Sequence, residues 1–139
     1  MKLTHLIDTD WSIDYLQGKP ATLGRVNELV RRRVLGISIV CIAEIYEGVL
    51  YSREPVSRER ALKHFLRLTR LLPLDRDIAK IFGRERGRLR KAKKLEEIGD
   101  LDVLIGATAL RHNLALLTNN RRHFEHIRGL RMESLQDPD

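Results

Sequence analysis

Short apolar runs alternate with segments of helical spacing, and this alternation most constrains the fold of the chain. The runs that predict strands are LTHLID, GISIVCI, LLPLD, LALLTNN and RMESL, which begin at residues 3, 36, 71, 114 and 131. Between them, apolar side chains recur at the three- and four-residue intervals of amphipathic helices. Because parallel strands need crossover helices, the alternation predicts an α/β domain with a parallel sheet.

Capping residues, prolines and glycines bound the helical segments. The predicted helices cover residues 10–18, 21–34, 43–52, 57–70, 75–94 and 99–113. Asp100 is the natural N-cap of the last of them. The chain has 139 residues and shows no linker, repeat or low-complexity segment, so we expect a single domain over residues 1–139.

Composition excludes several classes of protein. Cys41 is the only cysteine, which allows neither an internal disulfide nor a cysteine-based zinc site. No apolar run approaches the roughly 20 residues that span a bilayer, and the N-terminus lacks the features of a secretory signal. We therefore expect a cytoplasmic protein with no membrane partner. The net charge of +7 fits either solubility alone or a polyanionic partner such as RNA.

Polar side chains follow the predicted strands where each strand ends. Asp8 follows LTHLI, Glu44 lies just past GISIVCI, residues 118–120 follow LALL, and Asp100 and Asp102 open the preceding helix. The carboxyl ends of parallel strands meet at one edge of a sheet, so these groups should converge. Converging carboxylates repel one another unless a cation joins them, and Mg²⁺ or Mn²⁺ prefers oxygen ligands. This predicts an acidic metal site within a basic surface, as a nuclease requires.

Each of these side chains also has a purely structural interpretation. Asp8 could simply cap the next helix, and Asp100 and Asp102 could simply serve a helix N-terminus. Glu44 points away from the apolar face of its predicted helix, as a solvated glutamate would. Asn119 and Asn120 could form a plain turn.

Two groups of basic residues are candidates for RNA contact. Arg84, Arg88 and Lys91 line one side of a basic helix, which is equally typical of a solvated surface. Arg121 and Arg122 directly follow Asn120. The five histidines show no ligand spacing, so we expect them in packing or at the surface.

Four segments in order, LIDTD, SIVCIAEIYEG, DLDVLIGATAL and LLTNNRRHF, resemble the PIN-domain family, and within it the VapC-type toxins. The resemblance covers nearly the whole chain. It implies a three-layer α/β/α domain with a central, mainly parallel sheet of four to five strands. The family's acids then fall on Asp8, Glu44 and Asp102, with Thr9 as the hydroxyl neighbour of the first.

The fourth position of the family's site falls on Asn120, two residues after Thr118, and Asp100 is a supporting acid. Many members of the family carry aspartate at this fourth position. With an amide there, we expect one well-held metal. The resemblance implies a Mg²⁺- or Mn²⁺-dependent endoribonuclease that cuts tRNA, rRNA or mRNA. It also implies a homodimer that a cognate VapB-like antitoxin inhibits by covering the acidic site.

Two alternatives stay open at this point. In a haloacid-dehalogenase-like phosphatase, LIDTD would supply Asp8 as nucleophile and Asp10 as general acid. Such an enzyme needs a downstream lysine, and none follows Thr118. The second alternative is a non-catalytic RNA- or protein-binding domain that keeps the fold, and the intact Asp8, Glu44 and Asp102 argue against it.

Overall fold

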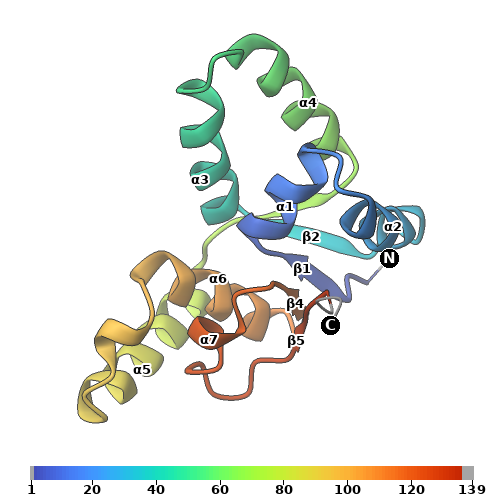
Figure 1. Cartoon of the computed structure of the whole chain (residues 1–139). Helices are drawn as coiled ribbons and strands as arrows, with labels where there is room; N and C mark the ends of the chain where they lie inside the picture. Colours follow the sequence, from blue (N-terminus) through green and yellow to red (C-terminus); the bar gives the residue numbers. More distant parts are fainter. Residues whose placement is uncertain (1, 136–139) are drawn as a thin grey trace.

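The computed structural model describes residues 2–135 and contains a five-stranded sheet with helices on both faces (Figure 1). Along the chain the elements are β1 (His5–Ile7), α1 (Thr9–Leu16), α2 (Pro20–Arg31), β2 (Leu35–Ser38), α3 (Ile39–Leu50), α4 (Pro55–Arg67), β3 (Arg70–Leu72), α5 (Arg76–Lys91), the 3-10 turn η1 (Leu95–Glu97), α6 (Asp100–Arg111), β4 (Ala115–Leu117), α7 (Arg121–Phe124) and β5 (Met132–Glu133). The predicted domain also included residues 1 and 136–139, which lie outside the described residues.

The strands lie in the order β3-β2-β1-β4-β5, and every neighbouring pair is parallel. Helices α1 to α4 cover one face of the sheet, and α5 to α7 cover the other (Figure 1). This confirms the predicted α/β/α fold with a parallel sheet. The chain builds outward from β1 in one direction through β2 and β3, and in the other through β4 and β5. Ligands of such sheets bind where the order reverses, which here is the carboxyl edge between β1 and β4.

The predicted boundary between the second strand and the helix that follows it is wrong. Residues 36–42 were expected to form one strand, but β2 ends at Ser38 and α3 begins at Ile39. The Ser38 hydroxyl accepts a hydrogen bond from Val40 N at 3.0 Å and thereby caps the helix. Because every residue of this segment except Ile39 is buried, its apolar side chains suit a strand and a helix equally. Within residues 2–135, none of the helices combines the length and the apolar character that crossing a membrane requires.

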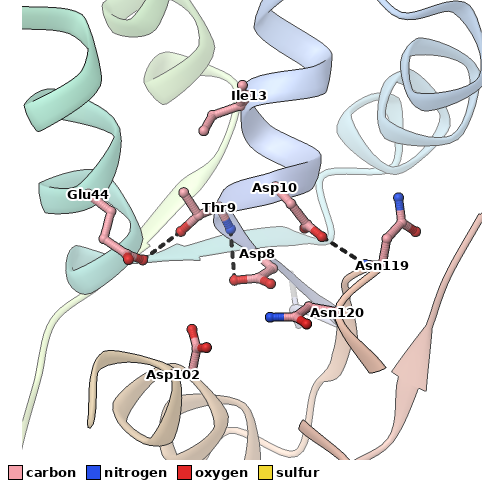
Figure 2. Close-up of a pocket in the computed structure, with 8 residues that line it drawn as sticks. All are labelled: Asp8, Thr9, Asp10, Ile13, Glu44, Asp102, Asn119 and Asn120. Carbon is pink, nitrogen blue, oxygen red and sulfur yellow. Dashed lines mark hydrogen bonds between the residues drawn. The ribbon is translucent and has the colours of Figure 1, made fainter. Parts of the chain in front are cut away.

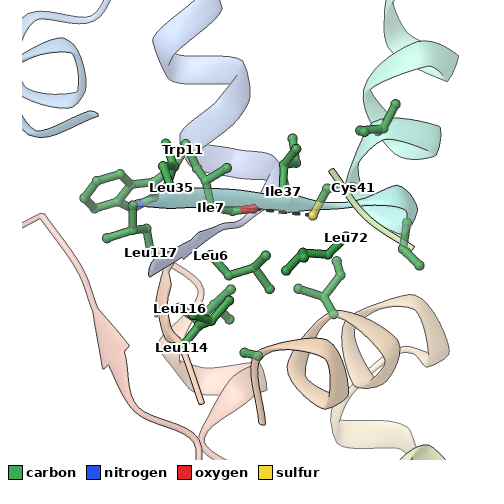
Figure 3. Close-up of a cluster of buried hydrophobic side chains, with 14 of the residues drawn as sticks. Leu6, Ile7, Trp11, Leu35, Ile37, Cys41, Leu72, Leu114, Leu116 and Leu117 are labelled. Carbon is green, nitrogen blue, oxygen red and sulfur yellow. Dashed lines mark hydrogen bonds between the residues drawn. The ribbon is translucent and has the colours of Figure 1, made fainter. Parts of the chain in front are cut away.

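The core lies on both faces of the sheet and includes Trp11, Leu6 and Leu116 (Figure 3). Trp11, Phe65 and Phe124 are its largest fully buried side chains. Each such side chain contributes roughly 1.5–3 kcal/mol to stability when it is removed from water. Cys41 is buried in the same core, and its Sγ donates to the carbonyl of Ile7 at 3.6 Å. The core therefore holds α1 and α3 against the end of β1, where the candidate site lies.

Helix α6 packs closely against the segment that follows α7. A Cβ atom at Gly106 would lie 2.3 Å from Ile127 Cδ1, so a larger residue would require the end of the Ile127 side chain to move. Gly99 occupies the N-cap position of α6, and Asp100 is its first helical residue. The expectation that Asp100 caps the helix is therefore wrong by one residue. The close packing sets the position of the first turn of α6, which carries Asp102.

Candidate active site

A pocket of about 510 Å³ opens at the carboxyl edge of the sheet (Figure 2). It is lined by Asp8, Thr9, Asp10, Ile13, Glu44, Asp102, Asn119 and Asn120. These residues come from the junction of β1 with α1, from α3, from α6 and from the loop after β4. The fold thus brings the predicted acids Asp8, Glu44 and Asp102 to one pocket, together with Asn120.

Asp8 follows the last residue of β1 and is buried, with 4% of its surface exposed. Its Oδ1 accepts a hydrogen bond from Thr9 N at 2.8 Å, and its Oδ2 accepts one from the Thr118 hydroxyl at 2.6 Å. Burial raises the pKa of Asp8 to about 7, with Asp10 and Asp102 adding to the rise and these two hydrogen bonds opposing it. Asp8 therefore both caps α1 and supplies a carboxylate that a nearby cation would stabilise in its charged form.

Glu44 lies in the second turn of α3 and is half-buried in the pocket wall. Its Oε1 accepts a hydrogen bond from the Thr9 hydroxyl at 2.8 Å (Figure 2). Helical spacing had predicted a solvated side chain, because Glu44 lies off the main apolar face. Helix α3, however, also contacts α1, and this contact covers a second face of the helix.

Asp102 projects from the first turn of α6 into the pocket and is half-buried. Burial raises its pKa, and His123 opposes this rise. The Nδ1 atom of His123 lies 3.5 Å from Asp102 Oδ2 and 2.8 Å from Asn120 Nδ2. His123 thus contacts two of the predicted site residues, although spacing along the chain had indicated only packing or surface roles for histidine.

Asp10 is a fourth carboxylate of the pocket, which the motif resemblance did not include. Its Oδ1 accepts from Trp11 N at 2.7 Å, and its Oδ2 accepts from Asn119 N at 3.0 Å. Burial raises the pKa of Asp10. Asn119 Oδ1 in turn accepts from Trp11 Nε1 at 3.1 Å, so α1 is tied to the loop after β4. The only signal in the sequence was the position of Asp10 two residues after Asp8, in the first turn of a helix.

The predicted supporting residues differ in their contacts. Thr9 and Thr118 donate to the acids directly, and Thr118 Oγ1 also accepts from Asn120 N at 3.0 Å. Asp100 instead faces α5, where its Oδ1 lies 3.1 Å from Arg86 Nε. Asp100 is exposed and does not line the pocket. Side chains two residues apart in a helix point to different sides of the helix, so Asp100 and Asp102 face different surroundings.

Arg88, one of the predicted RNA contacts, makes internal contacts in the structure, and its contact with RNA stays a prediction. Its Nη2 donates to Glu85 Oε1 at 2.9 Å and to the carbonyl oxygen of His126. Glu85 is buried, with 2% of its surface exposed, and also accepts from Arg128 N at 2.9 Å. Arg88 and Glu85 therefore join α5 to the segment after α7.

The other four predicted RNA contacts are exposed. Arg84 and Lys91 lie on α5, and Arg84 Nε lies 3.5 Å from Glu85 Oε2. Arg121 and Arg122 form the first turn of α7 and directly follow the pocket residue Asn120. Contact between these side chains and RNA stays a prediction.

Comparison with known proteins identifies the family of the chain. The family model of the PIN domain matches residues 6–130. The chain belongs to the PIN-domain family. Its sequence is similar to that of Ribonuclease VapC19 from Mycobacterium tuberculosis, with 37% identity over 120 residues that cover 86% of this chain and 90% of the relative. It is also similar to Ribonuclease VapC2 from Haemophilus influenzae, with 31% identity over 133 residues that cover 95% and 98% of the two chains.

The fold of this PIN domain is also found in a chain of a solved toxin–antitoxin complex. The crystal structure of DNA-bound VapBC from Salmonella typhimurium matches with a TM-score of 0.87 and 27% identity, covering 95% of this chain and 98% of that chain. The resemblance of the four segments to VapC-type proteins is therefore confirmed.

The donors of the PIN-domain pocket are all oxygen atoms of the kind that Mg²⁺ and Mn²⁺ prefer. In the described part of the chain there is no group of three or more Asp, Glu, His or Cys side chains that could hold a metal ion by itself. Mg²⁺ usually keeps several waters and takes only one or two carboxylates. A pocket of about 510 Å³ with separated carboxylates fits such a hydrated ion, and not a closed protein cage.

Proposed function

We propose that this chain is a Mg²⁺- or Mn²⁺-dependent endoribonuclease that acts as the toxin of a toxin–antitoxin pair. The observation that carries the proposal is the convergence of Asp8, Asp10, Glu44 and Asp102 on one pocket. The similarity to two VapC ribonucleases supports RNA as the substrate.

The residues of the pocket would have different roles in phosphodiester hydrolysis. A divalent ion bound there supplies a water of lowered pKa and offsets charge on a phosphoryl oxygen. Asp8 and Asp102 would hold this ion, with Glu44 as the third acid. Thr118 holds one oxygen of Asp8, and Thr9 holds one oxygen of Glu44, so both carboxylates are oriented before the substrate arrives.

The surroundings of the pocket suit a polyanionic substrate and a protein inhibitor. Arg121 and Arg122 are exposed beside Asn120, where they can contact phosphates on either side of the cleaved bond. We propose a cognate VapB-like antitoxin that covers the pocket, in keeping with the VapBC complex from Salmonella typhimurium. A homodimer that acts in the cytoplasm is part of the same proposal.

The phosphatase alternative has less support from this geometry. Both oxygens of Asp8 accept hydrogen bonds, which makes the carboxylate a poor nucleophile, and no lysine is among the residues that line the described pocket. The non-catalytic alternative predicts that loss of a pocket acid leaves RNA unchanged, and the next experiment tests this.

The decisive experiment compares Asp102→Asn with Asp100→Asn. The two acids share one helical turn, but only Asp102 lines the pocket. After expression in cells, mapping of new RNA ends should show discrete cuts for wild type and Asp100→Asn and none for Asp102→Asn. With purified protein, EDTA should abolish the cuts, and added Mg²⁺ or Mn²⁺ should restore them. Cuts that persist in folded Asp102→Asn would refute the assigned site.

A further inference from the structure

A basic groove lies at the amino ends of the strands, on the opposite edge of the sheet from the acidic pocket. It consists of two adjoining hollows of about 530 and 400 Å³ that share Leu3 and Arg70. Arg33 and Arg67 line the first hollow, and Lys2, Arg111 and His112 line the second. We call these two hollows together the amino-edge groove.

The charge of the amino-edge groove is of one sign. Neither hollow has an aspartate or glutamate among the described residues that line it. Arg111 is neutralised by Asp77, whose Oδ2 lies 3.2 Å from its Nε. Arg33, Arg67 and Arg70 form no ion pair with any residue in the range 2–135. Three guanidinium groups around one hollow, without acidic partners among the described residues, suit an anion with several phosphates.

Local structure accounts for only part of this arrangement. Arg67 lies in the last turn of α4, where a cation offsets the helix dipole. Arg33 follows α2 with a φ of 57°, a left-handed conformation that glycine adopts with less strain. Arg70 belongs to strand β3 and has no helix end to neutralise. The three side chains come from different elements, yet they line the same hollow.

We propose that the amino-edge groove binds the phosphodiester backbone of RNA at a segment away from the cleaved bond. The partly exposed apolar side chains of Leu3 and Leu68 lie among the arginines and offer contact to ribose and base. The groove and the acidic pocket lie at opposite ends of the strands, so only a long or folded RNA reaches both. The choice of RNA as the ligand rests on the proposed function.

Binding is tested with the triple substitution Arg33→Gln, Arg67→Gln, Arg70→Gln. The probe is a fluorescein-labelled 40-nucleotide polyuridylate, measured by anisotropy in EDTA, and every variant also carries Asp102→Asn. Loss of three phosphate contacts should make the slope of log K against log salt shallower by about 2 and weaken binding by about tenfold or more at low salt.

The matched control replaces three other exposed arginines, Arg53, Arg60 and Arg76, with glutamine. They line neither hollow and form no ion pair within the part of the chain that the structure covers. The proposal requires a clearly smaller change in slope for this control. Equal changes in the two triple variants would show that only net charge matters and would overturn it.

Assays of RNA cleavage distinguish the role of the amino-edge groove from that of the active site. With the catalytic acids intact, the groove triple variant should raise KM for a long folded RNA and leave kcat and the cleavage of a short fragment around the cut unchanged. A wild type that cuts no RNA contradicts the proposed function, whereas an unchanged KM contradicts the groove. Arg33→Gly should weaken binding without lowering Tm, because glycine relieves the left-handed backbone; a fall in Tm with unchanged binding would assign Arg33 to the fold alone.

Discussion

The two edges of the sheet carry opposite charge and differ in how firmly that charge is held. At the carboxyl edge, Asp8 and Glu44 are at least half-buried and accept hydrogen bonds from threonine hydroxyls. At the amino edge, Arg33, Arg67 and Arg70 are exposed. The parallel topology explains the division, because helices begin near one edge and end near the other. Helix N-termini favour acids and C-termini favour bases, so the connectivity accounts for part of this separation of charge.

Glu44→Gln, at the carboxyl edge, should give the largest effect, which is a loss of RNA cleavage. Removing the charge of an acid at a metal site costs about 10–100-fold even for supporting positions, so we expect a loss in kcat/KM of about 100-fold. Glu47→Gln, an exposed change on the same helix, is the control. RNA cleavage with purified protein measures both. If Glu44→Gln cleaves RNA at the wild-type rate, Glu44 takes no part in cleavage and the chemistry depends on Asp8 and Asp102.

Exchanging Asp10 and Asn120 tests which residue supplies the fourth carboxylate. Asp10→Asn should lower cleavage and Mn²⁺ affinity by about tenfold, because the pocket loses one charge. Adding Asn120→Asp returns that charge at a neighbouring position and should recover much of the loss. If the double variant stays as impaired as Asp10→Asn, the role of Asp10 is to hold the Asn119 loop.

Arg88→Gln tests whether a basic residue outside the amino edge stabilises the fold. We expect the free energy of unfolding to fall by about 1.5 kcal/mol, since buried Glu85 loses a charge-assisted hydrogen bond. Lys91→Gln is the exposed control and should leave Tm unchanged. Denaturant unfolding measures both. A drop in RNA affinity for Arg88→Gln at unchanged stability would contradict this assignment.

The smallest effect is expected in how much more Mg²⁺ stabilises the fold at one pH than at another. The pKa of Asp8 is about 7 in the folded protein against 3.8 for the free side chain, so the folded state holds more protons between these values. Without metal, the free energy of unfolding should therefore fall as pH rises from about 4 to 7. Mg²⁺ favours the charged form, so it should raise Tm by about 4 °C more at pH 8 than at pH 6. Asp8→Asn should remove this difference, and thermal unfolding measures it.

The alternation of strands and helices and two of the acids could be predicted from the sequence, because the alternation follows from periodicity and the acids follow from their places at the ends of its segments. Asp8 follows directly after a strand, and Asp102 opens a helix next to another strand. The contacts of Asp10 and His123 could not be predicted, because they depend on how α1 and α7 meet the loop after β4. Glu44 is an intermediate case. The resemblance to the PIN-domain family predicted it as a site residue, whereas the apolar spacing of its helix predicted a solvent-exposed side chain.

The direct passage from β2 into α3 at Ser38 has a geometric consequence for Glu44. With no loop between strand and helix, the direction of this carboxylate is set by a count of residues along one rigid helix. Inserting one residue between Ser38 and Glu44 would turn the side chain by about 100° and move it by about 1.5 Å along the axis. The length of this segment should therefore tolerate no change, even where its composition can vary.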